Sequence, residues 1–171
     1  MIELYAAPTT NGLRARMALE ECGLAYNLHP VDLAKGEQKA PQFVAMNPWG
    51  QIPVMVDPDG PGGKPLTLSQ STAILMYAAE KSGKLMPKDP AARPLLLQAL
   101  MSGSTDVTPN YGSVVALQRV EKHDPSMQAV KNRIRGALKG WDAQFATRKY
   151  CLGEEYSIAD ISLYCGYVRC K

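Results

Sequence analysis

The first residues that could do chemistry are Thr9-Thr10-Asn11, at the junction of a predicted strand and a predicted helix. A helix N-terminus offers unpaired backbone N–H groups and about half a positive charge, and hydroxyl and amide side chains add donors. Such a site favours an anion, and a thiolate fits because its thiol then ionises at a lower pH. The segment has no cysteine, so a ligand would supply the thiolate. A plain helix cap by Thr10 or Asn11 is the commoner role of such residues.

Two further segments could bind other parts of the same ligand. Gln51-Ile52-Pro53 precedes an apolar run, and a cis Pro53 would turn the backbone of Ile52 outward to pair with a peptide. The base rate of about 5–6% cis favours an ordinary trans proline. Gln70-Ser71 opens a predicted helix, which could hold a carboxylate or could simply be capped there. Together the three segments match the groups of a thiol tripeptide.

The pattern of apolar residues predicts a layered α/β domain that positions these segments. The opening β-α-β order favours a right-handed parallel unit, and the turn-rich residues 57–63 predict an antiparallel hairpin. The resulting β-α-β-α-β-β-α order fills residues 1–83 with one small sheet domain. We expect strands at 2–6, 25–31, 54–56 and 66–68, and helices at 13–22, 42–46 and 69–81.

The composition changes after residue 83, and the second half predicts helices only. Three prolines between 87 and 94 indicate a linker over 84–90, followed by an all-helical domain over 91–171. Helical spacing covers 91–121, with a break or kink expected at Pro109, and continues over 125–148. Ser157 and Asp160 resemble a capping box that opens a third helix.

Composition and charge exclude several classes of protein. A net charge of +3 on 171 residues is too small to indicate a nucleic-acid groove. No apolar stretch approaches the ~20 residues of a membrane span, and the N-terminus lacks a secretory signal, so we expect a cytoplasmic protein. The four cysteines form no C-x-x-C pair and no spacing typical of zinc, so we expect no metal. With no cysteine at the first helix start, a thioredoxin-like oxidoreductase that uses its own thiols is disfavoured.

At this point the residues resemble the glutathione transferases, in which a thioredoxin-like first domain precedes an all-helical second domain. The resemblance covers essentially the whole chain. Its Thr-x-Asn motif and Lys-Gly-x-Gln loop look like the bacterial nu-type class, whose members reduce disulfides with glutathione. The motifs that carry the resemblance are Ala7-Pro8-Thr9-Thr10-Asn11-Gly12, Lys35-Gly36-Glu37-Gln38, Asn47-Pro48, Gln51-Ile52-Pro53, Gln70-Ser71-Thr72-Ala73-Ile74-Leu75 and Tyr156-Ser157-Ile158-Ala159-Asp160.

The resemblance implies a role for each residue of a glutathione site. Thr9 and Asn11 would bond to the glutathione sulfur as the catalytic pair, and Ile52, beside a cis Pro53, would pair with the cysteinyl backbone. Gln38 would reach the glycyl end. Gln70 and Ser71, at a helix start, would hold the γ-glutamyl group. Arg133, within a helix, would reach the glutathione of a partner subunit. The whole predicted glutathione-binding set is Thr10, Gln38, Gln51, Ile52, Pro53, Gln70, Ser71 and Arg133.

The resemblance also implies an activity, a co-substrate and an assembly. We expect a glutathione-dependent transferase or disulfide reductase that acts in detoxification on a small electrophile or disulfide, as a homodimer, with glutathione as co-substrate and no metal. Family members usually continue past the helix that begins at Ser157, whereas this chain ends at Lys171, so we expect an incomplete helical domain. A non-catalytic glutathione-binding or scaffold protein of the same fold is the alternative.

Overall fold

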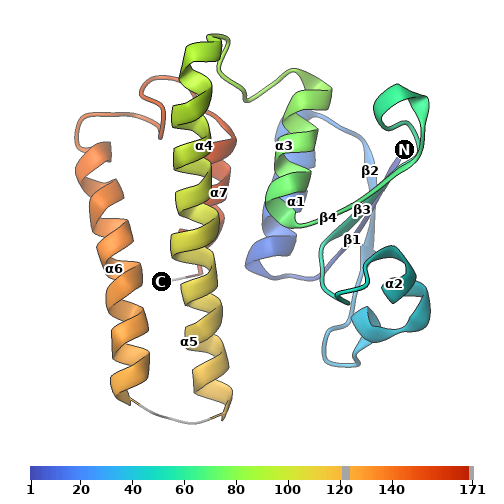
Figure 1. The fold of residues 1–171 in the computed structure, drawn as a ribbon, viewed down its shortest axis with the longest axis horizontal. Coiled ribbons are helices and arrows are strands. Elements are labelled where there is room, and N and C mark those ends of the chain that lie inside the picture. The colour runs from blue at the N-terminus through green and yellow to red at the C-terminus, as the bar shows by residue number, and fades with distance from the viewer. Residues whose placement is uncertain (121–123, 170–171) are drawn as a thin grey trace. The chain divides into compact units, whose positions relative to one another are not determined.

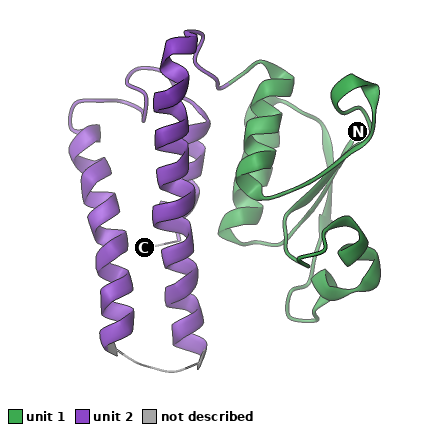
Figure 2. Cartoon of the chain, in the orientation of Figure 1, with its two compact units in different colours: residues 1–84 green, residues 85–171 purple. Residues whose placement is uncertain are grey.

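The computed structural model describes residues 1–120 and 124–169 and divides the chain into two compact units. The first unit holds residues 1–84 and the second holds residues 85–171 (Figure 2). Each unit has a hydrophobic core of its own, so each is described separately.

A four-stranded mixed sheet forms the centre of the first unit (Figure 1). The order across the sheet is β2-β1-β3-β4, with β1 parallel to β2 and antiparallel to β3, and β3 antiparallel to β4. The strands are β1 Ile2–Ala6, β2 Tyr26–Pro30, β3 Val54–Asp57 and β4 Leu66–Ser69.

The register of these strands places three strand ends side by side. Tyr5 of β1 pairs with Val54 of β3, and Val54 pairs with Ser69 of β4. The carboxyl ends of β1 and β4 therefore meet the amino end of β3 at one end of the sheet.

Three α-helices cover the two faces of this sheet (Figure 1). The first, α1 Thr10–Cys22, and the third, α3 Ser71–Ser82, pack together on one face, and α2 Pro41–Met46 lies on the other. The unit also has short 3-10 turns at Glu37–Lys39 and Pro61–Gly63. Completely buried core residues include Leu4, Leu19, Met55, Ile74, Leu75 and Ala78.

The predicted β-α-β-α-β-β-α order is confirmed, but two helix starts are wrong. The helix predicted from residue 13 begins at Thr10, and its N-cap is Thr9 rather than Thr10 or Asn11. Thr9 has extended backbone and its side chain accepts from the Gly12 N–H, the arrangement of an N-cap. The helix predicted from residue 69 begins at Ser71, because the chain up to Ser69 pairs as strand β4.

The second unit contains helices and no strand among its described residues, as the sequence predicts. A 3-10 turn at Pro90–Ala92 precedes the first helix. The capping box is confirmed: Ser157 caps the last helix, and its backbone N–H donates to Asp160 at 2.9 Å. The helices are α4 Arg93–Met101, the π-helical segment η4 Ser102–Val107, α5 Thr108–Val120, α6 Asp124–Phe145 and α7 Ile158–Tyr167.

Where a break or kink is expected at Pro109, the chain instead has the π-helical segment η4 just before this proline. Proline has no N–H to donate and its ring crowds the preceding turn. The chain remains helical through this point, with Thr108 donating from its backbone N–H and its hydroxyl to the Gly103 carbonyl, five residues back. Gly103 lies against α7, where a Cβ would come within 2.8 Å of the Ser162 hydroxyl. The end predicted at residue 121 lies outside the described residues.

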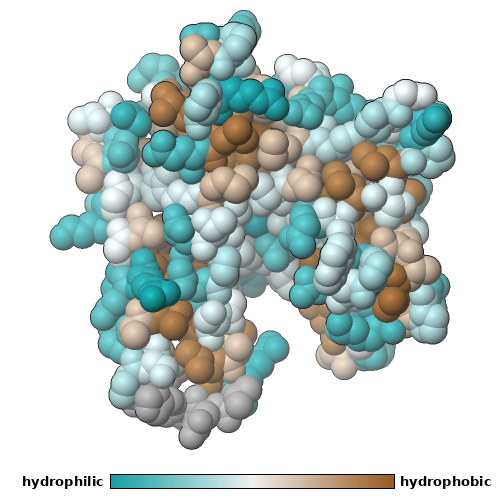
Figure 3. Space-filling model, viewed as in Figure 1, coloured by the Kyte–Doolittle hydropathy of each residue, from teal (hydrophilic) through white to brown (hydrophobic). Residues whose placement is uncertain are grey.

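On the face drawn in Figure 3, hydrophilic and hydrophobic residues are interspersed over both units. The most exposed large apolar side chains include Trp49, at 69%, and Leu95, at 60%. No helix of the described residues is long and apolar enough to cross a membrane.

A buried carboxylate ties α3 to the sheet and so fixes the direction of the helix that begins at Ser71. Asp57, at the end of β3, is 2% exposed. The Tyr77 hydroxyl donates to it at 2.6 Å, and the Lys81 ammonium pairs with it at 2.7 Å. Burial alone would raise the pKa of Asp57, but the bonds from Lys81, Tyr77 and the Asp59 N–H outweigh it, and the net pKa is lowered.

The lowered pKa of Asp57 predicts an acid-sensitive contribution to stability. The contribution is complete above the pKa of an unfolded aspartate, about 3.9, and is lost as the pH falls through the lower folded pKa. We expect Asp57→Asn to lower the free energy of unfolding at neutral pH by about 1–3 kcal/mol. Urea unfolding at a series of pH values should show a shallower acid loss in Asp57→Asn than in the wild type. The exposed Asp142→Asn is the control, and an identical acid loss in Asp57→Asn and the wild type would contradict the assignment.

Candidate functional site

The three polar segments singled out in the sequence lie at the same end of the sheet. Thr9 follows β1, Pro53 precedes β3, and Gln70 follows β4. Because Tyr5, Val54 and Ser69 pair in one row, these three connections must leave the sheet next to one another. The register therefore assembles one site from segments that are far apart in the chain.

Hydrogen bonds join two of the segments directly. The guanidinium Nη1 of Arg14 donates to the Asn11 side-chain oxygen and to the Ser71 hydroxyl, at 2.9 Å each. The Ser71 hydroxyl also contacts the same Asn11 oxygen, at 3.2 Å. Asn11 and Ser71 are 60 residues apart, so the first turns of α1 and α3 meet through their side chains.

The first turn of α1 presents donors to the outside. The Thr9 hydroxyl oxygen accepts from the Gly12 N–H at 3.1 Å, which leaves its hydrogen available to a ligand. Asn11 is exposed, and its side-chain NH₂ has no hydrogen-bond partner among the described residues. Thr10, at 8% exposure, is buried under the turn and is the least accessible of the three. Thr9 and Asn11 are thus the side chains here that can donate to an anion.

The position of this turn depends on a glycine. A Cβ on Gly12 would lie 2.0 Å from the Ala7 carbonyl oxygen. Only glycine lets the start of α1 approach the end of β1 this closely. That approach sets the distance between Thr9, Asn11 and the sheet.

The loop before β3 offers a backbone for pairing. The Ile52–Pro53 bond is cis, as the resemblance implies, so the trans form favoured by base rate is wrong here. Asn47, at 3% exposure, holds the loop by donating to the Gln51 carbonyl at 2.7 Å. The backbone N–H and C=O of Ile52 make no hydrogen bond within the described part of the chain. They can therefore pair with an extended ligand.

Gln70 has a backbone conformation that is costly for a side chain. Its φ is +73°, and such strain persists only where the surroundings enforce it, often at binding sites. Its carbonyl accepts the first bond of α3, from Ile74 at 3.0 Å, while its side chain makes no cap and is exposed. The amide of Gln70 is thus available beside Ser71.

The two remaining predicted residues are Gln38, which lies in the first unit near the loop before Pro53, and Arg133, which lies in the second unit. Gln38 lies in the turn Glu37–Lys39, whose backbone packs against Gly50 in the loop before Pro53. Its buried Oε1 has no hydrogen-bond partner among residues 1–120 and 124–169. Arg133 is exposed on α6 in the second unit, whereas the other predicted site residues belong to the first unit.

The described cysteines are unsuited to act as nucleophiles. Cys22, Cys151 and Cys165 are all buried, and Cys170 lies outside the described residues. Burial raises the pKa of the Cys22 thiol, and burial together with Asp160 raises the pKa of Cys151. Thiol chemistry at the end of the sheet would therefore use a thiol carried by a ligand.

Arg14, which is not among the residues predicted from the sequence, is 1% exposed and is central to the site. The spacing of apolar residues in α1 could have identified Arg14. Arg14 lies four residues after Thr10 and four before Ala18, on the face of α1 that also contains Ala15 and Leu19. A charged residue on the apolar stripe of a helix is rarely buried without a partner.

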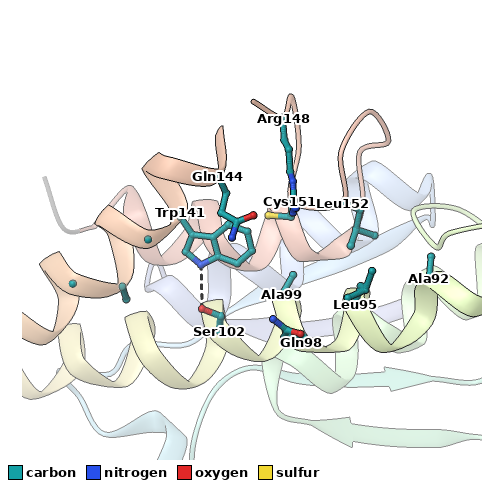
Figure 4. A pocket seen from close by; sticks show the side chains of 13 residues that line it. Ala92, Leu95, Gln98, Ala99, Ser102, Trp141, Gln144, Arg148, Cys151 and Leu152 are labelled. Carbon is teal, nitrogen blue, oxygen red and sulfur yellow. Dashed lines mark hydrogen bonds between the residues drawn. The ribbon is translucent and has the colours of Figure 1, made fainter. Parts of the chain in front are cut away.

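A cavity of about 660 Å³ lies in the second unit between α4 and α6. Figure 4 shows Trp141, Gln144 and Arg148 facing Leu95, Gln98 and Ser102 across it. The Trp141 indole is fixed by donating to the Ser102 hydroxyl at 3.0 Å. The cavity also has polar side chains, including Gln98, Gln144 and Arg148, but its one thiol, Cys151, has a raised pKa and is unsuited to act as a nucleophile.

Comparison with known protein families and curated relatives shows which proteins this chain resembles. The family model described as the N-terminal domain of glutathione S-transferase matches residues 10–81. The chain is 36% identical over 170 residues to the disulfide-bond oxidoreductase YfcG of Escherichia coli, covering 96% of this chain and 78% of that protein. It is 32% identical over 182 residues to glutathione S-transferase 3 of Zea mays, covering 93% and 73%.

Solved structures also resemble this chain over nearly its whole length. A glutathione transferase family member from Pseudomonas fluorescens, with two glutathione molecules bound, has a TM-score of 0.94 and 35% identity, covering 99% of this chain and 76% of that one. A glutathione transferase from Pseudomonas putida, with one glutathione disulfide bound per subunit, has a TM-score of 0.93 and 36% identity, covering 99% and 75%.

The close approach at Gly12 predicts a large effect of adding one methyl group. We expect Gly12→Ala to lower the free energy of unfolding by at least about 2 kcal/mol, because the clash is with backbone that cannot turn aside. Gly112→Ala is the matched control: it also lies inside a helix, with open space around its Cβ, and should be neutral or stabilising by up to about 1 kcal/mol. Urea unfolding measures both, and equal stability of the two variants would refute the role of Gly12.

Proposed function

Because this chain belongs to the glutathione S-transferase family, we propose that it binds glutathione across the three strand ends and directs the glutathione thiolate at a disulfide or a small electrophile. The observation that supports this most directly is the contact of Asn11, Arg14 and Ser71, which unites a thiolate-type and a carboxylate-type site. The relatives supply the ligand, since the two Pseudomonas proteins bind glutathione or its disulfide.

Each part of glutathione has a matching group in the site. The sulfur lies at the first turn of α1, with Thr9 and Asn11 as donors. The cysteinyl backbone pairs with Ile52 as an added strand would. The γ-glutamyl carboxylate lies at the start of α3, beside the exposed Gln70 side chain and the hydroxyl of Ser71, which is 6% exposed. The long 3.2 Å contact from that hydroxyl to Asn11 lets it turn to the ligand.

The remaining predicted residues complete the ligand's surroundings. Gln38 reaches the glycyl end of glutathione, where its Oε1 and amide have no competing partner among the described residues. Thr10, which is buried, contributes backbone rather than side chain. The Gln51 carbonyl is held by Asn47, so Gln51 contributes its exposed side chain. Arg133 contacts the glutathione of a partner subunit.

The donors at α1 are sufficient in strength for the chemistry. Lowering a thiol pKa by one unit corresponds to about 1.4 kcal/mol of preference for the thiolate. A helix N-terminus contributes about 0.3–1 kcal/mol and a hydrogen bond to a charged group about 1.5–3 kcal/mol. One or two such groups shift the thiol of glutathione toward its nucleophilic form near neutral pH.

A disulfide is the favoured second substrate. The motifs resemble the nu-type class, and the curated relative from Escherichia coli is named as a disulfide-bond oxidoreductase. The bound thiolate attacks one sulfur, a mixed disulfide forms, and the other sulfur leaves as a thiolate. A second glutathione thiolate then attacks the mixed disulfide at the glutathione sulfur, giving glutathione disulfide and releasing the second substrate thiol. This reaction needs no metal.

We also propose that the protein acts in the cytoplasm, in detoxification, as a homodimer. Sedimentation of the purified protein measures the assembly independently of any ligand.

Glutathione binding is predicted to change the fluorescence of Trp49. This side chain is exposed in the loop that precedes Ile52, and Trp141→Phe leaves it as the only tryptophan. We expect saturable binding of glutathione, and a Kd raised at least about tenfold by Ser71→Ala, which removes a hydrogen bond to a carboxylate. Ser113→Ala, in the second unit, is the control.

The titration, together with a turnover assay, decides between a glutathione-dependent enzyme and a non-catalytic glutathione-binding protein. No binding at millimolar glutathione contradicts the proposed site. Saturable binding without turnover of any disulfide or halogenated aromatic supports the alternative, a non-catalytic glutathione-binding protein.

Asn11→Ala is predicted to affect turnover more than binding. Loss of a donor to a developing or stabilised anion commonly lowers kcat by about 10²-fold, and we expect the Kd of glutathione to change by less than about threefold. Disulfide reduction assays and the fluorescence titration give the two values separately. Asn132→Ala, on α6, is the control, and equal kcat in Asn11→Ala and wild type would remove Asn11 from the mechanism.

A further inference from the structure

We propose that Arg14 is a positioning residue that holds the Asn11 amide with its NH₂ group toward the ligand sulfur, an inference that rests on the proposed function. Arg14 does not touch the sulfur in this proposal. It acts through Asn11, and its effect is on the ionisation of the bound thiol.

The burial of Arg14 shows that its contacts are specific. Its side chain is 1% exposed and is among the largest of the completely buried ones. A guanidinium that leaves water loses strong hydration, which hydrogen bonds within the protein must offset; Nε makes none among the described residues, so the terminal nitrogens provide them. Two of these acceptors are the side-chain oxygens of Asn11 and Ser71, both at 2.9 Å from Nη1.

The chemistry of the two side chains decides which way the Asn11 amide points. A guanidinium has only donors, whereas an asparagine amide has an acceptor at one end and two donors at the other. The end of Asn11 that faces Arg14 must therefore be Oδ1. The Ser71 hydroxyl makes a second, longer contact with the same oxygen, at 3.2 Å.

The opposite end of the amide is consequently directed away from Arg14. Asn11 is exposed, and its Nδ2 has no partner among the described residues. A ligand sulfur at the first turn of α1 then meets an N–H donor, which stabilises a thiolate better than a thiol. If the amide turned over, the sulfur would meet a carbonyl oxygen, which repels a thiolate and accepts from a thiol.

Arg14 also links the group proposed to bind the sulfur to the group proposed to bind the γ-glutamyl carboxylate. Nη1 bridges Asn11, at the sulfur, to Ser71, at that carboxylate. A charge-assisted hydrogen bond is about twice as strong as a neutral one, so this bridge is a strong connection between the starts of α1 and α3.

The test measures the pKa of bound glutathione in Arg14 variants by the ultraviolet absorption of its thiolate. We expect Arg14→Met to raise that pKa by at least one unit, and to lower kcat/KM near neutral pH about tenfold. Arg14→Lys should restore much of both values, because lysine retains the charge and donors. The control Arg16→Gln removes an equal charge from an exposed position on the same helix and should change neither value.

Two further measurements separate positioning from a purely structural role. S-methylglutathione has no ionisable thiol, so its Kd should change by less than about threefold in Arg14→Met if Arg14 acts through thiolate stabilisation. In an Asn11→Ala background, Arg14→Met should cause no further rise in the thiol pKa, because the group it positions is gone.

Several outcomes would overturn the proposal. A folded Arg14→Met with the wild-type thiol pKa would do so, as would an equal rise in pKa with and without Asn11. A tenfold or greater loss of S-methylglutathione binding would assign Arg14 to the architecture of the site. If Arg14→Met fails to fold, Arg14→Lys is measured instead, with Asn11 present and in the Asn11→Ala background. Its smaller rise in the thiol pKa must also vanish without Asn11 if the proposal holds. Absence of glutathione binding by the wild type would instead overturn the proposed function itself.

Discussion

The pairing register of β1, β3 and β4 determines where the candidate ligand-binding groups of the first unit lie. Tyr5, Val54 and Ser69 form one row, so the connections after β1, before β3 and after β4 leave the sheet together. A slip of one residue would turn the paired, buried Leu4 and Met55 away from the helices α1 and α3. The same core packing that stabilises the sheet thus assembles the site.

Buried polar groups then fix the positions of the helices α1 and α3 on the sheet more precisely. Asp57 ties α3 to the end of β3 through Tyr77 and Lys81, and Arg14 joins the starts of α1 and α3. Such groups are costly to bury without hydrogen-bond partners, so they tolerate few alternative arrangements. Helices held by apolar contacts alone could slide by fractions of an ångström, whereas these bonds define where Asn11 and Ser71 meet.

The sheet end of the first unit and the cavity of the second unit differ in what they offer a thiol. At the sheet end, Thr9 and Asn11 can donate from the first turn of a helix, next to a buried guanidinium. The cavity beside Trp141 has a volume of about 660 Å³, but its own thiol, Cys151, has a raised pKa. Volume alone is therefore a poor guide to chemistry here, because the ionisation of a thiol depends on its burial and on nearby charge.

Features that depend on neighbouring residues could be predicted from the sequence alone. The order of strands and helices, the capping box at Ser157 and the helix end at Gly83 follow from residues a few positions apart, and the structure confirms them. The three site segments were also recognisable, since their residue types and the family motifs are local. The choice of Thr9 as N-cap was missed because it depends on how closely Gly12 approaches Ala7, a contact made by the folded chain.

Which of these segments touch, and which atoms face a ligand, depends on long-range contacts in the folded chain. The contact between Asn11 and Ser71 spans 60 residues and depends on the strand register, which residue types alone do not specify. The role of Arg14 has the same origin, because a charged residue on an apolar helix face has meaning only once its buried partners are known. The orientation of the Asn11 amide depends in turn on that guanidinium, since a hydrogen bond is set by the positions of both partners, and packing brings these two together.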